Sequence, residues 1–300
     1  MKASVIISVR NDHRIVQCLS SIFEYGTLGL QEAFEVIVIE NSQEPVLAAR
    51  IRAFPVVYLL EQRQGMGYAR AKGIARAKGE FLVFTDADCV VSEGWLPKLL
   101  KPFGSPTVGI VGGPIAKLNP VTFTERAQRD LVIGGQREVQ YLPSIYPRPY
   151  VVTANAAYRT ADVKRAGGID PNFASGGDVD LAWRVGDLGY EAVIAHDALV
   201  FHACRPRPEA VFRQFFRYSM GHAQLFKKFK NQTGKKACLN AYPFIGCAKV
   251  VPNLLRALIR SETWNEKQLH IGEVGFQIIE YIALIAGATV GAVRTRTLYI

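Results

Sequence analysis

Residues 79–89 read GEFLVFTDADC, and this stretch decides the fold. The run from Phe81 to Phe84 is short, apolar and rich in β-formers, which predicts a strand buried on both faces. Asp86 and Asp88 follow it, and side chains two residues apart in extended backbone point to the same side. Two carboxylates there repel each other unless a cation or hydrogen-bond donors compensate. The pair therefore favours a Mg²⁺ or Mn²⁺ site that carries phosphate oxygens, with a polar helix-capping turn as the alternative.

The chain before residue 104 alternates between two kinds of hydrophobic pattern. Strands are expected at 4–9, 34–39, 56–60 and 81–84, and helices at 13–25, 47–53, 68–77 and 92–103, the last capped by Ser92. This alternation predicts an α/β fold, a Rossmann-like, mostly parallel sheet flanked by helices on both faces. Polar residues follow the carboxyl ends of these strands, where open α/β sheets bind ligands.

The order is less regular after residue 104. A strand is expected at 108–113, a helix and then a Tyr- and Pro-rich flap within 120–150, and one strand or a bent pair at 151–159. Helices are expected at 160–166 and 178–189, and short strands at 191–194 and 199–201. The basic, aromatic segment 208–230 is expected to be a helix, and its part 212–230 either contacts a membrane or a lipid acceptor or packs its aromatic residues in the core.

The composition indicates a folded protein with an anionic partner. Of 300 residues, 49% are hydrophobic, and 36 basic against 26 acidic residues give a net charge of +10. Nucleotide phosphates, an acidic membrane surface or nucleic acid would satisfy this charge. The five cysteines include no CxxC pair, which favours a reducing compartment. The apolar run near the N-terminus is too short for a signal peptide, so we expect a cytoplasmic protein or one at the inner face of the cell membrane.

The last third of the chain is an apolar, helical C-terminal extension. Residues 241–260 and 271–293 contain few charges, and Glu280 is the only charged residue of 274–293. Twenty such residues are long enough to span a bilayer, but Glu280 and Gln277 make a span costly. A spanning helix, an interfacial helix and a helix packed on the protein therefore all stay open.

Several motifs in a fixed order resemble glycosyltransferase family 2. These motifs are SVIISVRN at 4–11, VIVIENS at 36–42, QGMGYARAKG at 64–73, AKGEFLVFTDAD at 77–88, ANAAYR at 154–159 and GGDVDLAWR at 176–184. The resemblance implies a GT-A fold over residues 1–220, with a nucleotide-sugar-binding half at 1–115 and an acceptor-binding half at 116–220. Residues 221–300 then form a helical region that is membrane-associated in one of the open arrangements.

The resemblance also implies roles for single residues. Asp86, Asp88 and His202 would hold the metal, and an imidazole among oxygen ligands favours Mn²⁺ over Mg²⁺. Asp178 would be the catalytic base, with a helix N-cap as the alternative role. The residues implied to bind the donor are Ser8, Arg10, Asp12, Glu40, Asn41, Gly65, Arg70, Asp86, Ala87 and Asp88. The chain departs from the family pattern at Ser8, Arg10, Glu40, Ala71 and Gly177.

The implied reaction is transfer of a sugar, with inversion, from a nucleoside diphosphate sugar, by default a UDP-sugar. The acceptor would be a hydroxyl group of a glycan or a lipid-linked molecule, in polysaccharide, glycolipid or glycoprotein glycan synthesis. A sugar-nucleotide nucleotidyltransferase is disfavoured because the loop 10–13 lacks glycine. A non-catalytic, membrane-associated nucleotide-sugar-binding protein is a further alternative. Nucleic acid is excluded as a partner because the carboxylate clusters would repel its phosphates. An anionic membrane surface and an oligomer stay open.

Overall fold

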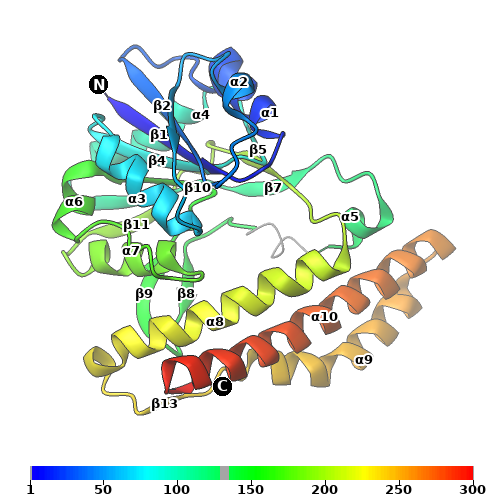
Figure 1. Ribbon diagram of the computed structural model, residues 1–300. Helices are drawn as coiled ribbons and strands as arrows, with labels where there is room; N and C mark the ends of the chain where they lie inside the picture. Colours follow the sequence, from blue (N-terminus) through cyan, green and yellow to red (C-terminus); the bar gives the residue numbers. More distant parts are fainter. Residues whose placement is uncertain (1, 129–134, 300) are drawn as a thin grey trace.

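The computed structural model describes residues 2–128 and 135–299, and a seven-stranded sheet lies at its centre (Figure 1). The strand order is β11-β6-β10-β4-β1-β2-β3. Strands β3, β2, β1 and β4 are parallel, β10 is antiparallel to both its neighbours, and β6 and β11 are parallel. The strands are β1 (Ala3–Val9), β2 (Phe34–Glu40), β3 (Val57–Leu60), β4 (Phe81–Asp86), β6 (Val108–Gly112), β10 (Asn155–Arg159) and β11 (Glu191–Ile194). The predicted α/β class with a mostly parallel sheet is therefore confirmed.

Both faces of this sheet are covered, as the apolar run of β4 predicts. Phe81 and Val83 pack into a core on one face, whereas Leu82 and Phe84 pack into a second core on the other. Helices α1 (Ile15–Ser21), α2 (Ala48–Ile51) and α4 (Trp95–Leu100) supply the first core; α3 (Met66–Arg76), α6 (Thr160–Arg165) and α7 (Gly177–Gly186) supply the second. A π-helical turn (Ile22–Gly26) extends α1, and a 3-10 turn (Lys101–Gly104) extends α4.

A small second sheet, which the sequence did not predict, stands beside the end of β4. It contains β5 (Cys89–Val91), β12 (Val200–Ala203) and β7 (Ile115–Leu118), with β12 in the middle. In the antiparallel pair of β12 and β5, His202 lies opposite Cys89. This register brings His202 next to the turn that carries Asp86 and Asp88. The sequence analysis expected the strand to end at residue 201, just before His202. In the structure His202 lies inside β12.

Two further local expectations are wrong. The flap expected at 141–150 is an antiparallel hairpin of β8 (Gln140–Leu142) and β9 (Tyr146–Tyr150). The N-cap of α4 is Gly94 in the left-handed conformation, not Ser92, whose backbone N–H instead donates to Leu199. The helix expected within 120–150 is α5 (Phe123–Ala127), while residues 129–134 of that prediction lie outside the described residues.

Three long helices form a C-terminal arm under the sheet (Figure 1). They are α8 (Pro208–Thr233), α9 (Tyr242–Arg260) and α10 (Trp264–Thr295), and a short parallel pair, β13 (Ala237–Cys238) and β14 (Leu298–Tyr299), closes the arm. Helix α10 packs against α8 on one side and α9 on the other, around a core of their own. Helix α8 runs through residue 220, where we placed the domain boundary from the sequence.

Helix α10 holds the acidic residue of the apolar C-terminal run. Among the described residues, α10 alone is long and apolar enough to cross a membrane, and 44% of its most apolar window is buried within the protein. Glu280 is almost fully buried, and its Oε1 accepts a hydrogen bond of 3.1 Å from the Tyr242 hydroxyl on α9. In this arrangement α10 packs on the domain, with its carboxylate facing inward.

Candidate active site

The site is built around the turn that joins β4 to β5. Asp86 is the last residue of β4, Ala87 is buried, and Asp88 precedes β5. His202 Nε2 lies 3.8 Å from Asp86 Oδ2 and 3.5 Å from Asp88 Oδ1. The two sheets thus bring both carboxylates of the Asp-x-Asp turn to one imidazole.

The hydrogen bonding of His202 leaves the right nitrogen for a metal. Its Nδ1 lies 2.9 Å from the Ala203 carbonyl oxygen, so a proton on Nδ1 is used there and the lone pair of Nε2 faces the two aspartates. Burial alone would lower the pKa of His202, but the charges of Asp88 and Asp86 raise it. Two carboxylates and one neutral imidazole fit a Mn²⁺ or Mg²⁺ ion.

Cys89 also lies in this group, with Asp88 and His202 offering ligand atoms within 4.8 Å of one another. Burial and the neighbouring carboxylates raise the pKa of the Cys89 thiol well above its usual value. The thiol therefore stays protonated, and a hard cation prefers the oxygen ligands beside it.

Guanidinium groups pair with each carboxylate of the turn. Arg205 Nη1 lies 3.1 Å from Asp88 Oδ2, and Arg70 Nη2 donates to Asp86 Oδ1 at 3.0 Å. Burial would raise the pKa of Asp86, but the neighbouring His202 and the charge of Arg70 outweigh it and hold that pKa below its usual range. The two guanidinium groups balance the charges of the two carboxylates, so a metal ion bound here would give the site the positive charge that suits an anionic ligand.

Arg14 is a functional candidate that the sequence analysis missed. Its Nε donates to Asp12 Oδ1 at 2.9 Å and its Nη2 to Asp12 Oδ2 at 2.6 Å. The same Nη2 lies 3.5 Å from Asp88 Oδ2. Burial would raise the pKa of Asp12, but these hydrogen bonds hold it below its usual value. Arg14 thus connects the loop after β1 with the Asp-x-Asp turn, and only its position two residues after Asp12 hinted at this.

Asp178 lies in the first turn of α7, half-buried. The N-cap of this helix is Gly176 in the left-handed conformation, so the capping role considered for Asp178 is not the one it has here. The Val179 backbone N–H donates to Asp178 Oδ1 at 3.0 Å. Burial raises the pKa of Asp178, although the nearby charge of Arg70 opposes this. A carboxylate with a raised pKa is a better proton acceptor than an exposed one.

The other acidic residue of that turn, Asp180, has a structural role. It is fully buried, and its two oxygens each lie 2.6 Å from a cation, Arg184 Nη2 on α7 and Lys228 Nζ on α8. The ion pair with Lys228 holds the start of α7 against the C-terminal arm, which fixes the position of Asp178.

Helix α8 and strand β9 add polar groups on the Asp178 side. Arg205 Nε donates to Gln214 Oε1 at 2.7 Å, and Gln214 Nε2 donates to the Tyr218 hydroxyl at 2.8 Å. Burial and the charge of Asp178 raise the pKa of both Tyr150 and Tyr218. The two phenols are therefore close to Asp178, and no sequence motif pointed to them.

The predicted donor residues of β1 lie beside the turn. Ser8 pairs in register with Asp86, and its buried hydroxyl has no hydrogen-bond partner among the described residues. Arg10 is exposed in the loop that follows. Together with Asp12, these residues form the part of the predicted donor site that lies at the carboxyl edge of the sheet.

Glu40 is not accessible beside them. Its Oε1 accepts hydrogen bonds from the backbone N–H groups of Val46 and Leu47 at 2.8 and 3.1 Å, and its Oε2 accepts one from the Tyr58 hydroxyl at 2.7 Å. The side chain has no exposed surface. In this arrangement the Glu40 carboxylate holds the loop after β2. Both of its oxygens are used within the protein, so it is not available for the direct contact with a nucleobase that we expected.

Asn41 and Gly65 shape the neighbouring loop. Asn41 Nδ2 donates to the carbonyl oxygens of Glu61 and Arg63 at 2.9 and 2.7 Å, and its Oδ1 accepts from the Gly65 N–H at 3.0 Å. Gly65 has φ of 133°, which a residue with a side chain rarely adopts. These two residues therefore set the path of the chain into α3, which carries Arg70 to the site.

Comparison with known proteins places this geometry in context. The family model described as glycosyl transferase family 2 matches residues 4–166. Glycosyltransferase AglE of Haloferax volcanii is 27% identical over 264 residues, which are 86% of this chain and 84% of that protein. The pre-mycofactocin glycosyltransferase of Mycobacterium tuberculosis is 38% identical over 144 residues, but the match covers 45% of this chain and 30% of that protein.

Solved structures of low sequence identity share the fold. The mannosyltransferase PcManGT of Pyrobaculum calidifontis, in complex with GDP-Man and Mn²⁺, has a TM-score of 0.63 at 18% identity, covering 97% of this chain and 86% of that one. GalNAc-T7 with UDP, GalNAc and Mn²⁺ has a TM-score of 0.54 at 14% identity, covering 76% and 50%. These similarities confirm the expected GT-A fold.

Proposed function

Because the chain belongs to glycosyl transferase family 2, we propose that it transfers a sugar from a nucleoside diphosphate sugar to an acceptor hydroxyl group with inversion. It is a glycosyltransferase, which removes the nucleotidyltransferase and the non-catalytic alternatives. The observation that carries the finer proposal is the convergence of Asp86, Asp88 and His202 beside two paired arginines.

The donor would bind at this convergence. Asp86, Asp88 and His202 would hold a Mn²⁺ or Mg²⁺ ion, which when bound neutralises charge on the diphosphate and on the leaving group. The Mn²⁺ in both solved neighbours supports manganese as the first choice. Arg70 and Arg205 hold the aspartates in place and supply positive charge for the diphosphate. Ser8, Arg10 and Asp12 flank the same edge and would contact the nucleoside.

Asp178 would act as the general base. Its raised pKa strengthens the carboxylate as a proton acceptor, and its anchored helix fixes its position near Arg70, the partner of Asp86. It would take the proton of the acceptor hydroxyl group as the oxygen attacks the anomeric carbon. The C–O bond to the diphosphate breaks as the new glycosidic bond forms, so no covalent enzyme intermediate is needed.

The donor base and the acceptor are proposed as classes. UDP is the default donor nucleotide, and the GDP-Man complex of the first neighbour keeps GDP in the test. A glycan or lipid-linked acceptor, at the cytoplasmic face of a membrane, suits the apolar arm beside the site.

Calorimetric titration tests the donor site. The purified protein is titrated with UDP, GDP and dTDP, each with and without Mn²⁺, next to Asp88→Asn and the exposed control Asp197→Asn. We expect metal-dependent binding of one nucleotide that Asp88→Asn abolishes and Asp197→Asn retains. Binding of no nucleotide under any condition, or equal binding by both variants, would overturn the proposed donor site. Once the donor is known, the anomeric configuration of the product, read by NMR, tests inversion.

A further inference from the structure

The outer face of α9 carries an apolar stripe. Phe244, Val251, Leu255 and Ile259 are all exposed, Val251 by 62% and Ile259 by 83%. Their spacing of seven, four and four residues places them on one side of the helix. Within the described parts of the chain, nothing covers this stripe, although α9 packs its other side against α10.

Helix α9 also carries cations, and no acidic residue of the helix itself accompanies them. Helix α9 contains Lys249, Arg256 and Arg260 and neither aspartate nor glutamate. Among residues 2–128 and 135–299, no hydrogen bond or ion pair reaches these three side chains. The neighbouring helix α10 also exposes apolar residues, Ile271, Ile278 and Ile282, seven and four residues apart. The arm therefore presents an apolar face with unpaired positive charge along its edge.

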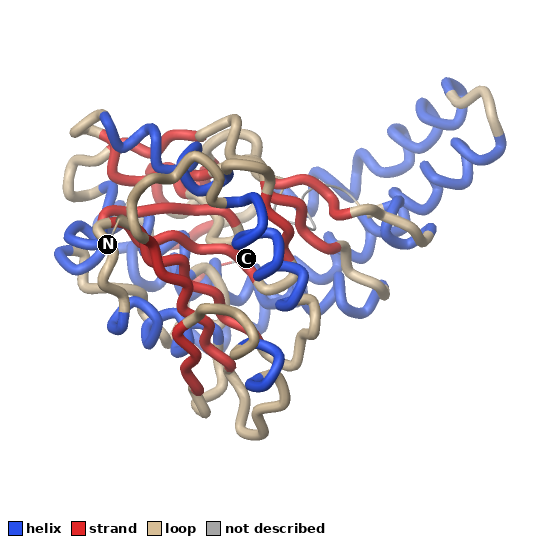
Figure 2. Tube along the Cα trace, turned by 90° about the horizontal axis from the view of Figure 1, so that it is seen from above, coloured by secondary structure: helices blue, strands red, loops and turns tan. Residues whose placement is uncertain are grey.

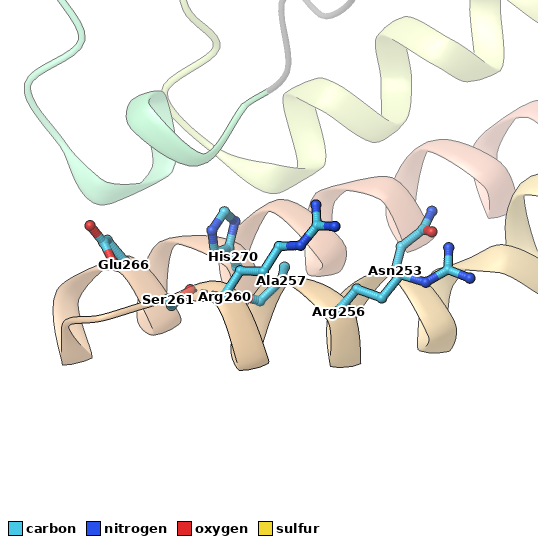
Figure 3. Close-up of a pocket in the computed structure, with 7 residues that line it drawn as sticks. All are labelled: Asn253, Arg256, Ala257, Arg260, Ser261, Glu266 and His270. Atoms are coloured by element: carbon cyan, nitrogen blue, oxygen red, sulfur yellow. Dashed lines mark hydrogen bonds between the residues drawn. The ribbon is translucent and has the colours of Figure 1, made fainter.

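Two of these cations also line a pocket between α9 and α10. The pocket measures about 590 Å³, and its lining includes Arg256 and Arg260 from α9 and His270 from α10 (Figure 3). Glu266 lies at one end, and its Oε2 accepts hydrogen bonds from the backbone N–H groups of Glu262 and Thr263. A phosphate group is the chemistry that two free guanidinium groups in one pocket would bind.

The position of α9 leaves this surface open to a large partner. Figure 2 shows two helices of the arm projecting beyond the body of the protein, and Figure 1 places α9 on the far side of α10 from the central sheet. By contrast, the aromatic residues of α8 are used inside the protein, because Phe215, Phe226 and Phe229 are buried. Burial of these residues agrees with a core role for the aromatic face of α8 and leaves α9 as the more exposed apolar helix.

We propose that α9 docks the protein on an anionic lipid bilayer. The apolar stripe enters the boundary between headgroups and acyl chains, and Arg256, Arg260 and Lys249 bind lipid phosphates along its edge. A second copy of the chain is disfavoured, because two α9 faces brought together would place like charges against each other. The three cations and the internal Pro252 fit a helix that lies on the membrane better than one that crosses it.

Vesicle flotation with the full chain tests the proposal. We expect binding to phosphatidylcholine vesicles that contain phosphatidylglycerol, little binding to phosphatidylcholine alone, and release by high salt. Arg256→Glu combined with Arg260→Glu should lower the bound fraction at least about tenfold, because each cation near such a surface contributes to binding. Leu255→Asp should lower it independently through the apolar stripe. Arg76→Glu combined with Lys101→Glu, and the exposed Val46→Asp, are the matched controls and should bind as the unchanged protein does.

Three results would overturn the proposal. The first is equal binding to neutral and anionic vesicles. The second is binding that resists both high salt and alkaline carbonate, which would indicate an inserted helix. The third is a protein that binds no vesicles but sediments as a dimer, which Leu255→Asp converts to a monomer. Circular dichroism of each variant separates misfolding from lost docking. The test needs no donor or activity, so its outcome is independent of the proposed reaction.

Discussion

Two groups of arginines carry the same charge but differ in whether a carboxylate pairs with them. The first group, Arg14, Arg70 and Arg205, lies in the active site, and the second, Arg256 and Arg260, lies on α9. Each of the first three lies within 3.5 Å of a carboxylate oxygen of the Asp-x-Asp turn. The other two have no such partner in the part of the chain that the structure describes. The first group is held in one geometry by its partners, whereas the second is free to bind an anion from outside.

This difference separates the consequences of losing each arginine. Removing a paired arginine leaves a largely buried carboxylate without compensation, so the turn and the donor site change together. Removing an unpaired, exposed arginine leaves the fold as it is and affects only what binds there. The predictions below test this separation, from the largest expected effect to the smallest.

Asp178→Asn should produce the largest effect, a fall in kcat of about 10²–10⁴-fold, because the amide cannot accept the proton of the acceptor hydroxyl group. Steady-state transfer measurements with the donor identified by calorimetry check this. Donor binding should be retained, since Asp178 lies outside the metal-binding turn. Transfer at an unchanged rate by the folded variant would remove Asp178 from the mechanism.

Arg205→Gln should weaken metal-dependent nucleotide binding by about 10–100-fold, because Asp88 loses the group that holds it. The matched variant Arg256→Gln, on α9, should bind the nucleotide as the unchanged protein does. Calorimetry of the two variants side by side gives the comparison. Equal losses in both would show that the two groups of arginines are not functionally separate.

The ionisation of Asp178 should also affect stability, with a sign set by its raised pKa. The folded state binds the Asp178 proton more tightly than the unfolded state does. The contribution of this residue to the free energy of unfolding is therefore lost as the pH rises through the pKa of Asp178 in the folded state. Asp178→Asn should therefore raise the free energy of unfolding at neutral pH and lose this advantage at about pH 3, where aspartate is protonated in both states. Urea unfolding at the two pH values measures the effect, and a variant less stable at neutral pH would contradict it. The same pKa predicts that the acidic limb of the rate profile lies above the usual range of aspartate.

The smallest effects are expected on the stability of the arm. Tyr242→Phe should lower the free energy of unfolding by about 1 kcal/mol, because Glu280 loses a buried hydrogen bond. Arg256→Gln with Arg260→Gln should change it by less than about 0.5 kcal/mol, since neither side chain has a partner to lose. Urea unfolding followed by circular dichroism distinguishes the two cases. A larger loss in the arginine variant would mean that these cations stabilise the fold after all.

The elements that the sequence predicted well are those with local causes. The apolar run from Phe81 to Phe84 predicts a buried strand from its own residues. The alternation of strands and helices before it predicts that the strands are parallel. Strand β10 enters the sheet antiparallel, and this depends on partners far away: Asn155 holds Trp95 Nε1, the Pro114 carbonyl and the Ala198 carbonyl with one side chain. No window of sequence contains those contacts together.

The candidate site divides in the same way. Asp86, Asp88, Asp178 and His202 were found because each lies in or near a family motif. Among the groups that surround them, Arg14, Gln214 and Tyr218 come from segments without a motif. They are recognisable only once β12 and α8 are packed against the turn.

By itself, the sequence determined which segments have apolar faces, where the carboxylates follow a strand, and that the chain carries surplus positive charge. The tertiary structure alone decided which of these groups are available. Glu40 was expected at a nucleobase and is enclosed by its own loop, whereas α8, for which a membrane contact and a core position both stayed open, is covered by α10. Helix α9, with a similar mixture of apolar and basic residues, is left open. The physical reason is that a hydrophobic period marks a face of a helix, but burial is set by the neighbour that packs on it.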